Sequence, residues 1–254
     1  MSDTGAKLLG QSLTIHVFGS VIALALLSRY NLKTGKREES YESQVVAALG
    51  TVFLFCYWPS LNQDLRFVDG PIVSKTAVAV NTMLSLTASC LVAMYTSRAL
   101  TGKFNMEVLI RATLSGGVVI SSAARLIEMP GISMLFGAFV GWISALAYCR
   151  VGRKKYTYGQ CASIWVHGVP GVIGHVLYMI MLGVQDGGDS VPLQIPAIII
   201  TIVLGGFTGI LAAALSYKFE SKSPTAFNDE EHFESVSYTA DQEMDNLVEP
   251  PAAP

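Results

Sequence analysis

Two histidines inside long apolar stretches are the residues of this 254-residue sequence best placed to do chemistry. His16 lies in Ser12-Leu-Thr-Ile-His16-Val-Phe-Gly, and His167 lies in Ser163-Ile-Trp-Val-His167-Gly-Val-Pro. A neutral imidazole carries one hydrogen-bond donor and one acceptor, so two facing imidazoles can share one proton and still contact a passing solute. Ionisable residues inside membrane spans commonly mark a substrate path or a proton relay. The pair therefore predicts a site that handles a small polar solute within a membrane.

The segments around the two histidines also resemble each other. Each has a serine four residues before the histidine and a Val-Ile pair five and six residues after it. Because five predicted crossings separate the segments, they should run in opposite directions, as in an inverted repeat, and such folds bind substrate near the membrane midplane. In the alternative interpretation each histidine only bonds a neighbouring carbonyl group and conducts nothing. The matched pair favours the first interpretation.

The elements that must position these histidines are membrane helices. Hydrophobic residues make up 51% of the chain and charged residues 14%, against roughly 25% charged residues in a soluble domain. The mean hydropathy is +0.46. Seven stretches are long and apolar enough to cross a bilayer: about 8–28, 43–62, 71–97, 106–127, 130–149, 160–183 and 193–217. We therefore expect an all-α, polytopic membrane helical bundle with seven transmembrane helices and a partial inverted repeat.

Proline and glycine add local detail to these helices. Pro59 and Pro170 are expected to interrupt the second and sixth spans, which is tolerated at membrane depth where protein or a cavity covers the freed backbone groups. Two small-residue motifs, Gly137-x-x-x-Gly141 and Gly205-x-x-x-Gly209, predict close helix packing. His175 lies eight residues beyond His167 and about 80° round the helix, so we expect it to pack rather than share one lumen with His167.

Charge divides the chain into a transmembrane domain, 1–218, and a tail, 219–254. The tail holds nine acidic residues and the single base Lys222, and we expect it to be disordered and cytoplasmic. Of the 17 basic residues, 13 fall on the side of the membrane that carries the C-terminus. The positive-inside rule then predicts an integral membrane protein with a cytoplasmic C-terminus. The start of the chain has no cleavable signal pattern, so the first span should remain in the protein.

Several segments resemble the ammonium transporter and Rhesus glycoprotein superfamily, and more specifically its Rhesus branch. Two of them contain the histidines already described, and the tail segment Asp229–Tyr238 is also similar. The other matching stretches are Gly50-Thr-Val-Phe-Leu-Phe-Cys-Tyr-Trp58-Pro59-Ser60-Leu61-Asn62, Val80-Asn81-Thr-Met-Leu-Ser85-Leu and Ala112-Thr-Leu-Ser-Gly116-Gly117-Val. The similarity covers the seven C-terminal helices of the eleven that the family shares.

The resemblance implies a channel or transporter for ammonia or ammonium, with His16 and His167 as the pore histidines. Family members form trimers, and each subunit conducts through a narrow apolar pore after ammonium loses its proton. The position of the family's aromatic gate corresponds to Leu61, three residues after Trp58. The resemblance therefore implies that Leu61 and Trp58 are candidates for the pore gate. The implied partners are ammonia or ammonium, the lipid bilayer, and a homo-oligomer or a complementary membrane chain.

Three differences from the family leave a second hypothesis open. The match begins at the family's fifth helix, the aspartates eight residues before each pore histidine are replaced by Leu8 and Gly159, and the gate phenylalanine is Leu61. A non-conducting, Rhesus-derived scaffold subunit would fit these differences. So would a gene whose first four helices are encoded upstream. We expect no enzyme, metal, cofactor or nucleic-acid partner, because no nucleophile–base group, metal-ligand spacing or phosphate loop occurs.

Overall fold

The computed structural model describes residues 12–29, 41–63, 73–152, 163–189 and 191–216, all within the first of two units of the chain, residues 1–220. These ranges contain helices and turns and no strand, as the all-α prediction requires. They form seven continuous helical units: η1 (Ser12–Val17) with α1 (Phe18–Arg29), α2 (Tyr41–Gln63), α3 (Lys75–Thr101), α4 (Met106–Ile120), α5 (Pro130–Ala147) with η2 (Tyr148–Gly152), η3 (Ser163–Gly168) with α8 (Val169–Asp186), and α9 (Val191–Ser216).

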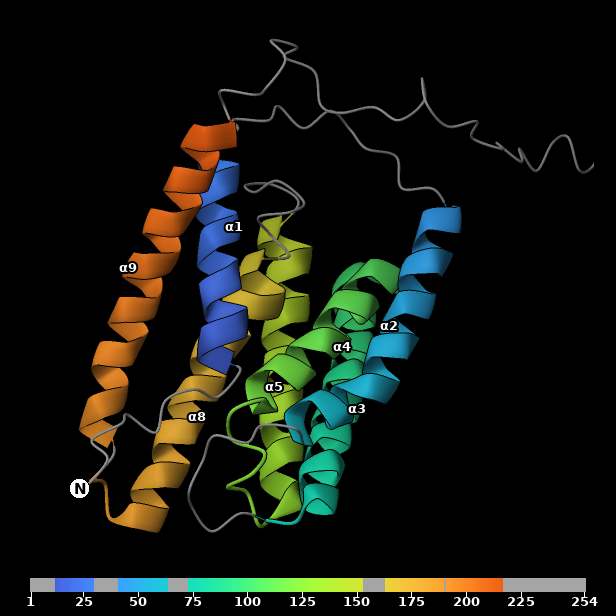
Figure 1. Cartoon of the computed structure of the whole chain (residues 1–254). Coiled ribbons are helices and arrows are strands. Elements are labelled where there is room, and N and C mark those ends of the chain that lie inside the picture. The colour runs from blue at the N-terminus through green and yellow to red at the C-terminus, as the bar shows by residue number, and fades with distance from the viewer. Residues whose placement is uncertain (1–11, 30–40, 64–72, 153–162, 190, 217–254) are drawn as a thin grey trace, which may run out of the picture. The chain divides into compact units, whose positions relative to one another are not determined.

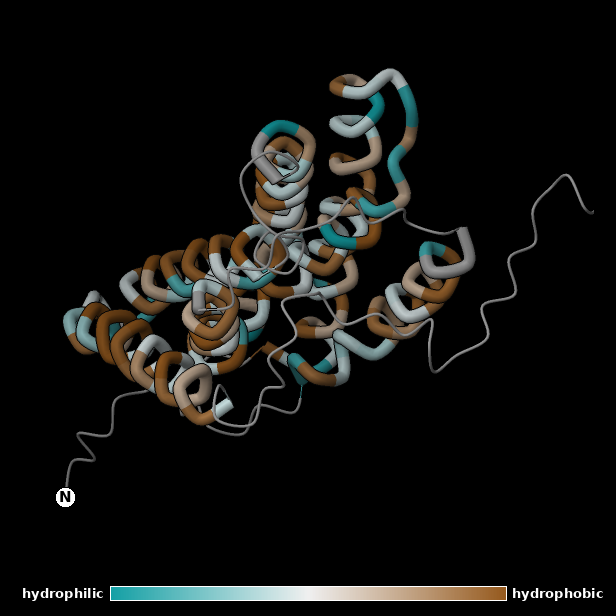
Figure 2. The backbone as a smooth tube through the Cα atoms, turned by 90° about the horizontal axis from the view of Figure 1, so that it is seen from above, coloured by the Kyte–Doolittle hydropathy of each residue, from teal (hydrophilic) through white to brown (hydrophobic). Residues whose placement is uncertain are grey.

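Five of the described units are long and apolar enough to cross a membrane, and they identify an integral membrane protein. These segments are Gln44–Gln63, Lys75–Thr101, Pro130–Arg150, Ser163–Gln185 and Val191–Ser216. Large apolar side chains also point outward: Val46 on α2 is 68% exposed and Phe207 on α9 is 65% exposed. Figure 2 shows hydrophobic residues on outward as well as inward faces of the helices. Such surfaces are stable in lipid, because lipid tails are as apolar as the side chains.

The helices form two groups that meet around the histidine-bearing turns. In Figure 1, α1, α8 and α9 lie on one side, while α2, α3, α4 and α5 lie on the other. Within the first group α9 packs mainly on α1; within the second, α3 packs on both α4 and α5. Helix α4 contacts members of both groups, including η1, η3 and α8. It is therefore the central element that supports the candidate site.

The prediction of a fourth span over 106–127 is wrong at its C-terminal end. Helix α4 ends at Ile120 after 15 residues, and the chain then turns over 121–126. At 1.5 Å per residue, α4 is about 22 Å long, shorter than the hydrocarbon core of about 30 Å. The backbone of this buried turn is satisfied internally: the Asn81 amide donates to the carbonyl groups of Ala124 and Ile127 over 3.0 and 2.8 Å.

Two further contacts complete the turn after α4. The backbone N–H of Val73 donates to the Arg125 carbonyl group over 3.3 Å, and the Gln185 amide donates to that of Leu126 over 3.4 Å. Irregular backbone is stable at membrane depth only where such partners exist. These partners come from α3, from the residues before it and from α8. No local sequence pattern therefore predicts the turn.

The two predicted proline breaks have different outcomes. Helix α2 continues through Pro59 to Gln63, so the predicted interruption of the second span is wrong. Pro170 lies in the first turn of α8, directly after the π-helical turn η3. The helical unit continues through Pro170, since Gly168 before it has right-handed helical dihedral angles, but the missing proline N–H removes one bond to the preceding turn. The sixth span thus changes its helical geometry near Pro170 without breaking.

Both predicted small-residue motifs mark close helix packing. A Cβ atom at Gly141 would lie 2.5 Å from the Ser89 carbonyl oxygen on α3, and one at Gly137 would overlap the main chain of Ser85. On α9, a Cβ atom at Gly209 would lie 2.7 Å from Ala25 on α1. Small residues therefore bring the backbones of α3 and α5, and of α1 and α9, into direct contact, which is how helices gain dispersion energy in lipid.

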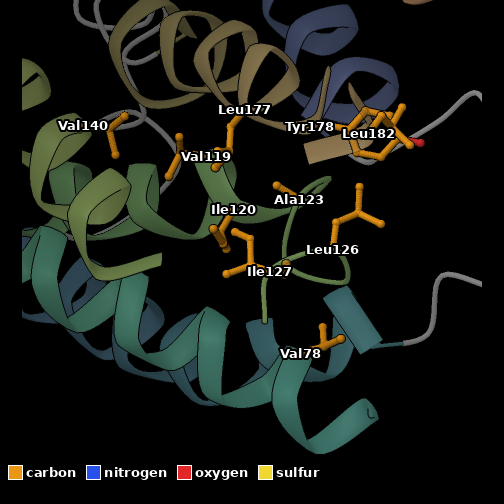
Figure 3. Packing of buried hydrophobic residues seen from close by; sticks show 11 residues of the cluster. Val78, Val119, Ile120, Ala123, Leu126, Ile127, Val140, Leu177, Tyr178 and Leu182 are labelled. Carbon is orange, nitrogen blue, oxygen red and sulfur yellow. The ribbon is translucent and has the colours of Figure 1, made fainter. Parts of the chain in front are cut away.

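The largest apolar core lies where α3, α4, α5 and α8 meet. It includes Ile120, Ile127, Leu177 and Tyr178, all at most 1% exposed. Figure 3 shows Leu177 and Tyr178 of α8 facing the end of α4 and the turn that follows it. This packing holds α8 against the central helix and so orients the turn that carries His167.

Candidate functional site

The helical units that carry His16 and His167 run antiparallel and touch at both ends of a short overlap. The Ser20 hydroxyl, four residues after His16, donates to the Ser163 carbonyl oxygen, four residues before His167, over 2.6 Å. At the other end, a Cβ atom at Gly171 would lie 2.9 Å from the Ser12 carbonyl oxygen. Later residues of one segment meet earlier residues of the other, as the inverted repeat predicts.

Each histidine lies in a π-helical turn that changes into an α-helix. His16 is the fifth residue of η1, and His167 is the fifth residue of η3. π-helical turns are rare and occur frequently at functional sites, because the wider turn displaces side chains from their α-helical positions. Sequence reasoning missed this feature, and nothing in the composition of the two segments signals it.

Three aromatic rings form a near-parallel row at the meeting point. The His16 and His167 ring centroids are 5.4 Å apart with an interplanar angle of 12°. The Trp58 ring also lies near-parallel to that of His16, with the centroids 5.7 Å apart and an interplanar angle of 16°. Both imidazoles are half-buried, whereas Trp58 is only 6% exposed. The predicted site residues His16, His167 and Trp58 are therefore brought together from η1, η3 and α2.

Trp58 is held by the central helix. A Cβ atom at Gly117 of α4 would lie 2.6 Å from the Trp58 Cε2 atom and 2.8 Å from its Nε1 atom. The indole also packs against Leu86 and Val118. Any side chain larger than hydrogen at Gly117 would overlap the indole, so this glycine sets the position of the Trp58 ring.

Hydrogen bonds to α4 anchor the turn that carries His16. The backbone N–H groups of Ser12 and Ser122 each donate to the other residue's hydroxyl, over 3.2 and 3.1 Å. The Ser12 hydroxyl also donates to the Val118 carbonyl oxygen over 3.0 Å. The first turn of a helix leaves backbone N–H groups without intrahelical partners. Here the Ser122 hydroxyl is the acceptor for the N–H group of Ser12. This anchor fixes the start of η1 against the end of α4.

The turn that carries His167 is anchored on α5. The Ser144 hydroxyl donates to the Trp165 carbonyl oxygen over 2.7 Å, and Trp165 packs against a cluster that includes Tyr148. The Tyr148 hydroxyl donates to Glu107 of α4, and Arg111 Nη2 lies 3.0 Å from Glu107 Oε1. This buried ionic cluster ties the ends of α4 and α5 together beside η3. Sequence reasoning missed it, although Glu107 and Arg111 show the i, i+4 spacing of a helical ion pair.

The other predicted or noted residues lie outside the row of rings. Leu61 is 53% exposed in the isolated chain, and its role as a gate stays a prediction. His175 is fully buried, and its role in packing stays a prediction. Leu8 and Gly159 lie outside the described residues, as does the acidic tail. Within the described ranges, no group of three or more His, Cys, Asp or Glu side chains could hold a metal ion.

The geometry can contact a small solute on more than one side. Two neutral imidazoles supply both donors and acceptors, and the indole face beside His16 adds a polarisable apolar surface. These groups lie on apolar helices of a membrane protein, so a full charge would be poorly solvated beside them, whereas a neutral molecule would lose little.

Comparison with known proteins places this arrangement in a family. The family model described as the Ammonium Transporter Family matches residues 5–224. The chain is 34% identical to the ammonium transporter Rh type C of Pan troglodytes over 179 residues, which cover 66% of this chain and 37% of that protein. It is 32% identical to the ammonium transporter Rh type A of Canis lupus familiaris over 205 residues, 75% of this chain and 48% of that protein. The chain thus spans less than half the length of these relatives.

Solved structures agree with the sequence comparisons. The Rh50 protein of Nitrosomonas europaea, described as one of the Rhesus protein family of channels, superposes with a TM-score of 0.75 at 25% identity, covering 96% of this chain and 64% of its own. Mep2 of Saccharomyces cerevisiae shares the fold, with a TM-score of 0.64 at 19% identity over 92% of this chain and 55% of its own. With its family match over most of the chain and its antiparallel histidine-bearing helices, the protein belongs to the ammonium transporter family and is similar to its Rhesus-type members.

Proposed function

We propose that this chain is a membrane channel or transporter subunit for ammonia or ammonium, and that neutral ammonia passes His16 and His167. The near-parallel approach of these two rings, 5.4 Å between centroids, carries the proposal. They come from antiparallel helices far apart in the sequence, so their approach results from tertiary packing rather than chain proximity. The similarity to ammonium transporters of the Rh type supports the choice of solute.

The proposed solute form follows from solvation. Ammonium would have to leave water for a path bordered by apolar helices, which costs several kcal/mol unless charged partners compensate. Ammonia carries no net charge and can exchange its water hydrogen bonds for bonds to the imidazoles. The proton would then stay at the entrance or move separately along the histidine pair.

The experiment is a measurement of ammonia entry into proteoliposomes. An ammonium pulse raises the pH inside vesicles that admit ammonia, and an internal dye reports the rate. We expect the full chain to accelerate this rise over empty vesicles. His16→Ala and His167→Ala should each slow the protein-dependent rate by about tenfold, since each removes a hydrogen bond of roughly 1–1.5 kcal/mol from a desolvated solute.

A matched control separates this effect from general damage. His232→Ala removes the one histidine in the predicted cytoplasmic tail and should leave the rate unchanged. If the wild-type chain gives the rate of empty vesicles, both alone and with candidate partner chains, conduction is excluded. The scaffold interpretation then gains support, because it requires helix packing but no ammonia path.

We also propose that the subunit works in an oligomer, as a homo-oligomer such as a trimer or with a complementary membrane chain. Two outer helices motivate this: only 11% of the spanning window of α2 and 17% of that of α9 is buried. Their apolar faces can adjoin lipid, a second copy or another chain. Native mass spectrometry from lipid nanodiscs distinguishes these states, and a uniform monomer with full activity would contradict the oligomer proposal.

We also propose a domain organisation and a membrane orientation for the chain. Residues 1–218 would form the transmembrane domain, and 219–254 would form an acidic tail on the cytoplasmic side. The distribution of basic residues supports this orientation. Single cysteines placed in the tail and after α8 should react with an impermeant thiol reagent from opposite sides of the membrane. Labelling of the tail from outside intact cells would contradict the orientation.

A further inference from the structure

A second polar site lies between α8 and α9, away from the row of aromatic rings. His175 of α8 is fully buried, and both its ring nitrogens lack a hydrogen-bond partner among the described residues. Gln194 of α9 is also fully buried, and its side-chain oxygen and nitrogen lack a partner too. Such atoms are unusual, because most buried side-chain polar atoms in proteins are hydrogen-bonded.

The two residues are neighbours. The His175 imidazole faces the main chain of Gln194 without forming a hydrogen bond of normal geometry. The His175 ring lies 5.7 Å from the ring of Tyr178, and Ala197, one turn after Gln194, belongs to an apolar cluster with Leu13. Two fully buried polar side chains without a hydrogen-bond partner among the described residues depend on each other or on a small bound molecule.

We propose that His175 and Gln194 together hold one small, neutral hydrogen-bonding molecule, either water or ammonia. A neutral imidazole offers one donor and one acceptor, and a carboxamide offers one acceptor and two donors. This set matches a molecule that both donates and accepts, and a buried water typically makes two to four hydrogen bonds. A metal ion or an anion would find too few charged ligands here.

The site lies beside the proposed conduction path rather than on it. His175 follows His167 by eight residues, which is about 12 Å along the helix and 80° round it. It faces α9, whereas His167 faces His16. The inference therefore does not depend on the proposed function, and its test uses the stability of the folded protein rather than transport.

The test compares apolar replacements in the full chain by thermal unfolding in nanodiscs. If a molecule bridges the two side chains, His175→Leu and Gln194→Met should each lower the melting temperature by a few degrees. The melting temperature of the double variant should be no lower than that of the less stable single variant. Either single change already removes the hydrogen bonds through the bound molecule. If instead each change raises the melting temperature and the two effects add, the side chains hold nothing and the proposal is wrong.

Gln185, near the end of α8, is the matched control. Its amide already donates to the Leu126 carbonyl oxygen. The effect of Gln185→Met should simply add to that of His175→Leu, because these residues share no ligand. If the control pair Gln185→Met and His175→Leu departs from additivity as much as the pair Gln194→Met and His175→Leu does, the proposal is wrong.

Two further measurements identify the occupant. A density map of the wild-type protein should contain a peak within hydrogen-bond distance of both side chains, and a direct His175–Gln194 contact without a peak would overturn the proposal. A rise in melting temperature with ammonium chloride but not sodium chloride at mildly alkaline pH, absent in His175→Leu, assigns ammonia. Equal behaviour in both salts, with the peak present, assigns water.

Discussion

The Ser20 hydroxyl donates to the Ser163 carbonyl oxygen over 2.6 Å, joining the helix after one histidine to the turn before the other. This bond spans 143 residues of sequence and links the two halves of the candidate site. A serine that bonded only its own helix would contribute nothing to this junction. The contact therefore makes the relative position of His16 and His167 testable by substitutions outside the row of rings.

Ser20→Ala should destabilise the junction by about 1 kcal/mol, the usual contribution of an interhelical hydrogen bond in a membrane protein. The expected fall in melting temperature is about 2–4 °C. The matched control is Ser28→Ala, which removes a serine of α1 whose hydroxyl bonds the Ala25 carbonyl oxygen of the same helix. Equal melting temperatures for the two variants would show that the Ser20 bond does not join the helices.

Gly117→Ala should displace Trp58, because the added Cβ atom would lie 2.6 Å from the indole. Overpacking of this kind costs about 1–3 kcal/mol. We expect a lower melting temperature, a changed tryptophan emission spectrum and a reduced proteoliposome rate. The control is Gly50→Ala on α2, where an added Cβ atom has no neighbour within 4 Å. An unchanged rate in Gly117→Ala would mean that the indole does not set the geometry of the rings.

Gly137→Ala tests the close packing of α3 and α5. Its Cβ atom would overlap the main chain of Ser85, and a backbone cannot move aside as a side chain can. We expect a loss of about 2 kcal/mol, seen as a lower melting temperature in detergent. Gly131→Ala on the same helix meets nothing within 4 Å and should be close to neutral. Similar losses in both variants would contradict the packing argument.

Glu107→Leu should be among the more damaging single changes, because it leaves the Arg111 side chain, 12% exposed, without its carboxylate. Removing one partner of a buried ion pair costs roughly 3–5 kcal/mol, whereas replacing both partners by apolar residues is often neutral. The double variant Glu107→Leu with Arg111→Leu should therefore recover part of the lost stability. Glu128→Gln, at an exposed position, serves as the control. A double variant that is less stable than Glu107→Leu would argue against the pair.

Much of the architecture could be predicted from the sequence. Apolar stretches of sufficient length favour helices in lipid, since a helix bonds its backbone polar groups within one segment where no water is available. The two echoing histidine segments predicted antiparallel helices, and the glycine pairs 137/141 and 205/209 predicted close backbone contacts; the structure confirms both. These features are local, because hydropathy, spacing and side-chain size are properties of short segments.

Other features depend on partners that lie far away in the chain. The end of α4 at Ile120 needs the Asn81 amide from α3, and the Trp58–His16–His167 row needs side chains from three helices. The continuity of α2 through Pro59 also contradicts the local rule that predicted a break. The sequence by itself determined an all-helical membrane protein with two matched histidines. Only the tertiary structure decided the ring stacking, the π-helical turns and the buried polar groups of His175 and Gln194, because each depends on surfaces that meet after the helices have packed.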